Sequence, residues 1–175
     1  MVRTVDVLAC EMADAYDGLT QVLSGLTEAE FAWEPVDASW RVFRDDQGRW
    51  TYDYAIPDPQ PAPFTTIGWR LVHIGLCKVM YHEWAFGPQE LTWTTIQTPS
   101  DLGASMATVE RGQGLLVDDL ASLSDDALKR RVLTNWGEEW PAWRIFTTMT
   151  AHDRHHGAEI GVLRDLYRIA GAFHV

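Results

Sequence analysis

Three histidines, His152, His155 and His156, lie within five positions of the segment AHDRHHGAEIGVL, residues 151–163. The segment has the pattern of a helix, in which residues four apart share one face with Cβ atoms about 6 Å apart. His152 and His156 have this spacing. Apolar residues continue their face in steps of three and four: Met149, Ile160, Leu163 and Tyr167. We therefore expect both imidazoles to point into the protein, where they can share one metal ion at about 2.0–2.1 Å from each nitrogen.

A third metal ligand would have to come from another helix. His73 lies in the apolar stripe of residues 65–86. Packed helices lie about 8–10 Å apart, so its side chain can reach the same ion. Other interpretations stay open at this point: His73 as a hydrogen-bonded core residue, and His152 with His156 as a polar pair. Cys77, one turn after His73, is expected to be a core residue rather than a ligand.

Four segments have the helical periodicity that would position these side chains. They are 5–23, 65–86, a segment that opens at Ser100, and about 139–170. Ser100 is the expected N-cap of the third helix. Pro141 fits the first turn of the fourth, where its missing amide proton is not needed. The pattern predicts an all-α fold, a four-helix bundle formed as one domain by residues 1–175.

An insert of about 36–64 separates the first two long helices. Before it, Thr27 and Glu30 have the spacing of a capping box, which predicts a short helical turn. Large and polar residues alternate on both sides of DDQG in SWRVFRDDQGRWTYDY, residues 39–54, which predicts a β-hairpin. The proline-rich stretch PDPQPAP, residues 57–63, predicts a stiff extended connector. We expect the insert to lie across one end or one flank of the bundle.

Composition excludes several classes of partner. Lys and Arg total 14 against 25 Asp and Glu, and the formal net charge of -11 repels phosphate backbones and anionic lipids. We therefore expect no nucleic-acid partner and no membrane partner. The chain lacks an apolar run of about 18 residues, and two cysteines cannot build a disulfide framework. Both observations favour a cytoplasmic protein. Nine tryptophans are unusual, and they indicate either core packing or an aromatic ligand pocket.

Three segments resemble the DinB-like family. The second helix carries TIGWRLVHIGLCKVMYHEWAFG at residues 66–87, similar to the family helix in which a ligand histidine follows a tryptophan-bearing start. The fourth carries TAHDRHHGAEIGVLRDL at residues 150–166, similar to a His-x-x-x-His signature that is normally followed by Gln-Ile. FAWEP, residues 31–35, resembles the segment after the family's first helix. The resemblance covers all four helices and leaves the insert unmatched.

The resemblance implies a four-helix bundle, often a homodimer, that binds one divalent ion through three histidines. In this sequence they are His73, His152 and His156. Members of the family resemble metal-dependent transferases, isomerases or hydrolases, and several use low-molecular-weight thiols such as bacillithiol, mycothiol or glutathione. The sequence departs from the family at Glu159, where Gln is usual. A carboxylate there would orient a ligand imidazole or bind the metal's water.

These residues lead to a hypothesis of metal-dependent chemistry on a small-molecule substrate. Three neutral ligands leave an ion one open position, and zinc there lowers the pKa of water to about 7 or holds a thiol as thiolate. Nickel, iron(II) and manganese also accept imidazole. Glu159 and His155 are the expected catalytic side chains, with Asp153 and Glu83 behind them. Three aromatic residues are candidates for the entrance: Trp69, Tyr81 and Trp84.

Two other classes of function compete with an enzyme. A metal- or ligand-binding bundle without turnover would retain its ligand but consume no electrophile. A purely structural bundle would hold no metal at all, which metal analysis of untagged protein would show. No phosphate-binding glycine loop, nucleophile elbow or paired-cysteine zinc motif points elsewhere.

Overall fold

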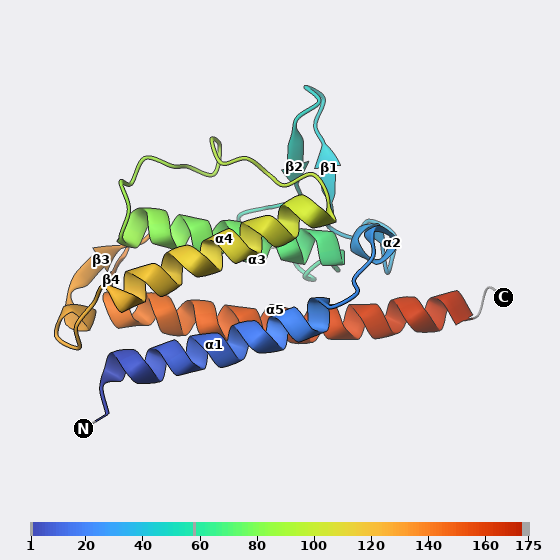
Figure 1. The fold of residues 1–175 in the computed structure, drawn as a ribbon. Coiled ribbons are helices and arrows are strands. Elements are labelled where there is room, and N and C mark those ends of the chain that lie inside the picture. Colours follow the sequence, from blue (N-terminus) through green and yellow to red (C-terminus); the bar gives the residue numbers. More distant parts are fainter. Residues whose placement is uncertain (1, 58, 173–175) are drawn as a thin grey trace.

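Four long helices form a bundle in the computed structural model, which describes residues 2–57 and 59–172. They are α1 Thr4–Leu23, α3 Ile67–Ala85, α4 Leu102–Ala121 and α5 Ala142–Ala172. Helix α3 packs along α4 and α1 packs along α5, while α3 also contacts α5 and so joins the two pairs (Figure 1). The predicted four-helix bundle is confirmed. Among the described helices, none is both long enough and apolar enough to cross a membrane.

Side-chain caps explain where two of the helices begin. The Thr66 side chain accepts a hydrogen bond from the amide of Trp69, which satisfies one of the free donors at the start of α3. Thr27 and Glu30 form the predicted capping box at the short helix α2, Glu28–Ala32. The capping box joins residues close in sequence, and this is why the sequence pattern was sufficient to predict it.

The N-cap of α4 is Asp101 rather than the predicted Ser100. The Asp101 carboxylate accepts a hydrogen bond of 2.8 Å from the amide of Ala104, while the Ser100 hydroxyl donates to that carboxylate. Ser and Asp are comparable caps, but the carboxylate also interacts favourably with the positive end of the helix dipole. The helix therefore begins one residue later than predicted.

The start of α5 differs from the prediction for a similar reason. Residues Glu139–Pro141 form strand β4, which pairs with strand β3, Arg131–Leu133, in an antiparallel hairpin. Gly137, with φ 80°, occupies the turn, and the helix begins only at Ala142. Pro141 is as acceptable at the end of an edge strand as in a first helical turn, so its presence did not distinguish the two. The sequence analysis missed this hairpin.

The predicted hairpin of the insert is confirmed. Strand β1, Val42–Arg44, pairs antiparallel with β2, Trp50–Tyr52, around a turn in which Gly48 has φ 75°. The hairpin projects from the bundle near the starts of α3 and α4 (Figure 1). A parallel bridge between Trp40 and Thr65 joins its base to the residue before the N-cap of α3. The insert is thereby fixed to the helix that carries His73.

The buried apolar side chains form two clusters along the bundle. The first includes Met12, Cys77, Tyr81, Leu116 and Met149. The second includes Leu19, Leu71, Ile74, Val109 and Ile160. His73 lies on α3 between Leu71 of the second cluster and Cys77 of the first, and the α5 histidines lie between Met149 and Ile160. The histidines therefore occupy a polar layer between two apolar halves of the core.

Candidate metal centre

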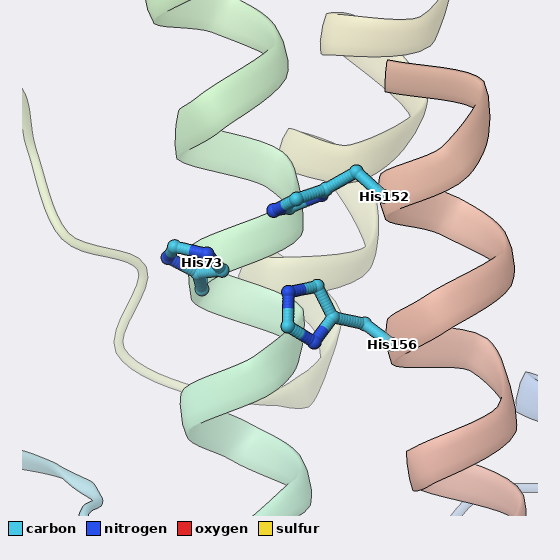
Figure 2. Close-up of side chains that lie close together, drawn as sticks. All are labelled: His73, His152 and His156. Carbon is cyan, nitrogen blue, oxygen red and sulfur yellow. The ribbon is translucent and has the colours of Figure 1, made fainter. Parts of the chain in front are cut away.

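The structure brings His73, His152 and His156 together (Figure 2). His73 extends from α3, and the other two extend from successive turns of α5 toward it. The ring centroids lie 4.9 Å apart for His73 and His152, 5.1 Å for His73 and His156, and 4.4 Å for His152 and His156. One nitrogen from each ring lies within 4.8 Å of the others, so small side-chain rotations would bring all three to one ion.

Burial keeps all three imidazoles neutral. It lowers the pKa of His73 to about 4, and the nearby Arg70 guanidinium acts in the same direction. Burial also lowers the pKa of His152 to about 2, and of His156 to about 3, with a further contribution from the neighbouring imidazoles. A neutral ring has one nitrogen with a free lone pair. The triad therefore offers metal-binding nitrogens at pH 7 without first losing a proton.

The position of the His156 proton follows from its contacts with Glu159. Nδ1 of His156 lies 2.7 Å from Oε2 of Glu159, and this carboxylate is also ion-paired with Nη1 of Arg70. Nδ1 also lies 3.0 Å from Nη1 of Arg70, a group that only donates, whereas an ionised carboxylate only accepts. The shorter contact, with Glu159, favours a proton on Nδ1 and a free lone pair on Nε2. The Arg70–Glu159–His156 network thus orients the imidazole of His156.

His152 supplies an independent test of the fit to a metal ion. Its Nδ1 is buried and finds no hydrogen-bond partner within residues 2–57 and 59–172. A buried polar atom left unpaired costs about 1–3 kcal/mol, and such atoms are uncommon in native proteins. A cation coordinated by Nδ1 would remove this cost. The three neutral nitrogen donors together fit zinc or another divalent ion that accepts imidazole.

Cys77 is buried against His73, with Sγ 3.7 Å from Nδ1 of the ring. Burial raises the pKa of the thiol to about 12, so it is protonated in the metal-free protein. The other neighbour of His73 is Trp69, whose indole stacks on the imidazole with centroids 4.8 Å apart. Tyr52 of the insert packs edge-on against the same indole. An aromatic wall therefore flanks one side of the triad.

Of the four other side chains considered for catalysis, two lie near the triad and two pair elsewhere. Glu159 contacts the triad, and the exposed His155 places Nε2 3.4 Å from Oε1 of Glu159. Asp153 instead pairs with Lys78 in the core, and Glu83 accepts hydrogen bonds from backbone amides in the loop after α3. Because these two carboxylates pair elsewhere, neither hydrogen-bonds to a histidine of the triad in the described part of the chain.

Of the aromatic residues expected at the entrance, only Trp69 contacts the triad. Nε1 of Trp84 donates a hydrogen bond to the carbonyl of Leu91 and so holds the loop that follows α3. The hydroxyl of Tyr81 accepts a hydrogen bond of 3.2 Å from Nε1 of Trp136. Tyr81 therefore links α3 to the β3–β4 hairpin, which the sequence analysis had not predicted.

Two basic residues near the triad were missed at the sequence level. Arg70 lies three residues before His73, a spacing that puts both on adjoining faces of one helix. Lys78 is 1% exposed, and its Nζ donates to Asp153 at 2.5 Å and to Gln113 at 2.6 Å. A cation inside an apolar helical stripe was the signal that could have found both, because such residues are seldom buried unless they are paired.

The Lys78 network also connects three of the helices. Lys78 lies on α3, Gln113 on α4 and Asp153 on α5, immediately after His152. On α4, a Cβ added at Gly112 would lie 2.6 Å from Cβ of Lys78, so glycine is needed for the close approach of the two helices. The network therefore fixes how α3 and α5 lie relative to each other at the level of the histidines.

A comparison with protein-family models agrees with this architecture. The model described as the DinB superfamily matches residues 11–160, a range that contains α3, α4, most of α1, the first part of α5 and all three histidines of the triad. A comparison with curated proteins found no match. The match covers most of the sequence and agrees with the helical bundle around the triad. The chain therefore belongs to the DinB superfamily.

Proposed function

We propose that the protein is a divalent-metal-dependent enzyme that activates a low-molecular-weight thiol, or water, for attack on a small electrophile. The observation that carries this proposal is the meeting of three neutral imidazoles from α3 and α5 within 4.8 Å. Such a donor set leaves a bound ion a free coordination position, which is typical of catalytic rather than structural sites. Zinc is the proposed ion, and nickel, iron(II) and manganese are the alternatives.

A bound divalent ion supplies a Lewis acid that lowers the pKa of a thiol or water molecule beside it. The side chains of the protein orient a ligand imidazole and accept the proton. Glu159 and Arg70 hold the ring of His156 in one orientation through the 2.7 Å contact at Nδ1. Oε1 of Glu159 lies 3.4 Å from Nε2 of the exposed His155, so a proton released by the nucleophile has a route to solvent.

In the proposed reaction, the thiol replaces a leaving group on the substrate. The thiol loses its proton to the Glu159–His155 route, and its sulfur forms a bond to the electrophilic carbon of the substrate. The leaving group departs with the electron pair of the broken bond. With water in place of the thiol, the same steps give hydrolysis. The aromatic wall of Trp69 and Tyr52 would shield the reacting atoms from solvent on the side of His73.

Metal analysis and turnover test the proposal together. Untagged wild type should hold about one ion per chain, and His156→Ala should lose most of it because one of three ligands has gone. The matched control is His82→Ala, since His82 also lies on a helix but pairs with Asp119, away from the triad. Thiol-dependent consumption of monochlorobimane should follow the metal content. Equal metal content in wild type and His156→Ala would overturn the proposal.

The same experiment separates the alternative, a metal- or ligand-binding bundle without turnover. That alternative predicts that wild type retains its metal but consumes no electrophile with any thiol supplied.

The family resemblance also predicts a homodimer, and light scattering of the purified protein would measure its mass in solution.

A further inference from the structure

A groove lies on the face of the bundle formed by α3 and α4. The loop that joins these two helices, residues 86–101, passes over them, and the β1–β2 hairpin projects beside the end of this loop (Figure 1). The groove enclosed by the loop, the hairpin and the two helices has a volume of about 1180 Å³. Pockets for small molecules usually measure about 300–1,000 Å³, so this groove has room for an elongated small molecule.

The lining of the groove combines an apolar base with neutral polar walls. Leu76 and Val79 of α3 lie at the base, and Trp93 and Ile96 of the loop close it from the side. Hydroxyl groups line the loop and the hairpin, from Thr51, Thr94, Thr95 and Thr98. An apolar surface with a few polar groups is typical of sites that bind small organic molecules.

One guanidinium at the groove has no partner. The chain has 14 lysines and arginines. Within the described ranges, Arg111 of α4 is the one cation among them that contacts neither a carboxylate nor an aromatic ring. No acidic residue lies three or four positions from it, where a helix would bring the two together. Arg111 is exposed at the groove, so its charge is available to a ligand.

The charges around the groove select the type of anion. The other arginine of the lining, Arg49, pairs with Asp45 at 2.9 Å, which leaves the lining one uncompensated positive charge. A guanidinium binds a carboxylate through two parallel hydrogen bonds, and the two charges cancel. A phosphate monoester carries nearly two negative charges at pH 7, and the net charge of -11 would oppose the excess. The groove therefore suits a monocarboxylate.

We propose that this groove binds a monocarboxylate with an elongated apolar body, such as a medium-chain fatty acid. The carboxylate pairs with Arg111 at the rim, and the hydrocarbon chain lies over Leu76 and Val79 beneath the loop. The recess is concave, which favours a small molecule as the occupant. Its lining shares no residue with the histidine triad, so the site does not depend on the proposed metal chemistry.

Calorimetry with octanoate and with 1-octanol tests the role of the charge in the protein as purified. Octanoate should bind saturably. Arg111→Gln should raise its Kd about three- to tenfold, as expected for a solvent-exposed bidentate pair, and leave the Kd for 1-octanol unchanged. The matched control is Arg154→Gln, which removes an exposed guanidinium that pairs with Glu11 of α1 and should change neither Kd. Equal Kd values for octanoate in wild type and Arg111→Gln would overturn the proposal.

Two further variants locate the ligand. Ala104→Phe adds a ring at a partly exposed position of the groove and should prevent binding of both octanoate and 1-octanol. His156→Ala should leave the Kd for octanoate unchanged, whatever its effect on metal content. Loss of octanoate binding in His156→Ala but not in Ala104→Phe would place the carboxylate at the metal centre and overturn the groove site. A dimer that dissociates in Ala104→Phe would also overturn it, because a second copy would then fill the groove.

Discussion

Two of the polar clusters that α5 buries differ in how completely their atoms are paired. Toward its C-terminal half, Nε of Arg164 donates to Glu30 at 2.9 Å, and its Nη1 donates to the carbonyls of Val22 and Ser24. Glu30 also accepts from the amide and hydroxyl of Thr27. Within the described residues these groups pair with one another, and the cluster holds α5 against the junction of α1 and α2.

The triad is the opposite case. Its rings are neutral, lie in the core, and leave Nδ1 of His152 unpaired among the residues that the structure describes. The Arg164 cluster stabilises the fold, whereas the triad could bind a metal ion that the fold does not provide. The comparison shows that burial alone does not identify a functional site. The informative property is a set of donors or acceptors left open inside the protein.

The largest expected effect is on the closed cluster. Arg164→Leu leaves the Glu30 carboxylate buried without its cation, which should lower the free energy of unfolding by about 3–5 kcal/mol. Urea denaturation measures this loss. The matched control is Arg168→Leu, which removes an exposed ion pair with Asp165 and should change stability by less than about 0.5 kcal/mol. The metal content per folded chain should be equal in both variants, and a selective loss in Arg164→Leu would contradict the division of roles.

The next effect concerns the network that orients His156. Glu159→Ala removes the acceptor for Nδ1 and should weaken metal binding about 10- to 100-fold, as expected for a partner that orients a ligand. Glu159→Gln should lose less, because its amide oxygen can still accept that hydrogen bond. Competition with a chromophoric chelator gives the affinities. If the three proteins bind metal equally well, Glu159 has no part in orienting the imidazole.

A smaller effect of opposite sign is expected at His152. His152→Leu removes the unpaired Nδ1 and replaces it with an apolar side chain of similar size, which should stabilise the metal-free protein by about 1 kcal/mol. The same change should abolish the rise in Tm that added zinc produces in wild type. Thermal unfolding with and without zinc measures both quantities. A less stable metal-free variant would show that the ring already has a partner in the core.

The smallest effect is the pH dependence of the closed cluster. Burial acts to raise the pKa of Glu30, but the hydrogen bonds from Arg164 and Thr27 outweigh it and hold the pKa below its ordinary value of 4.5. A depressed pKa stabilises the folded state above that value, and the contribution disappears as the pH falls through the pKa of the folded state. Urea midpoints should therefore separate wild type from Glu30→Gln at pH 7, and the difference should shrink as the pH falls below 4.5. A difference that stays constant over this pH range would rule this out.

Local patterns were enough to predict much of the bundle. The capping box of Thr27 and Glu30, the β1–β2 hairpin and the pairing of His152 with His156 on one face depend on residues close in sequence. The β3–β4 hairpin was missed because Pro141 suits a strand end and a helix start equally well. The first three predictions were correct because neighbouring residues favour a single local structure. The hairpin was missed because its residues suit two.

Longer-range contacts could not be predicted in this way. The pairing of Arg70 with Glu159 and of Lys78 with Asp153 depends on the rotation of α3 against α5. That rotation results from packing between helices, including the close approach of Gly112 to Lys78.

The sequence by itself determined that His152 and His156 share a face, because the helical repeat places residues four apart side by side wherever the helix lies. It also determined that His73 belongs to a second apolar stripe. Only the tertiary structure decided that the two stripes meet with their imidazoles at one level. The physical reason is that helix packing depends on the shapes of many side chains at once. The contact between two helices therefore cannot be predicted from any one pair of positions in the sequence.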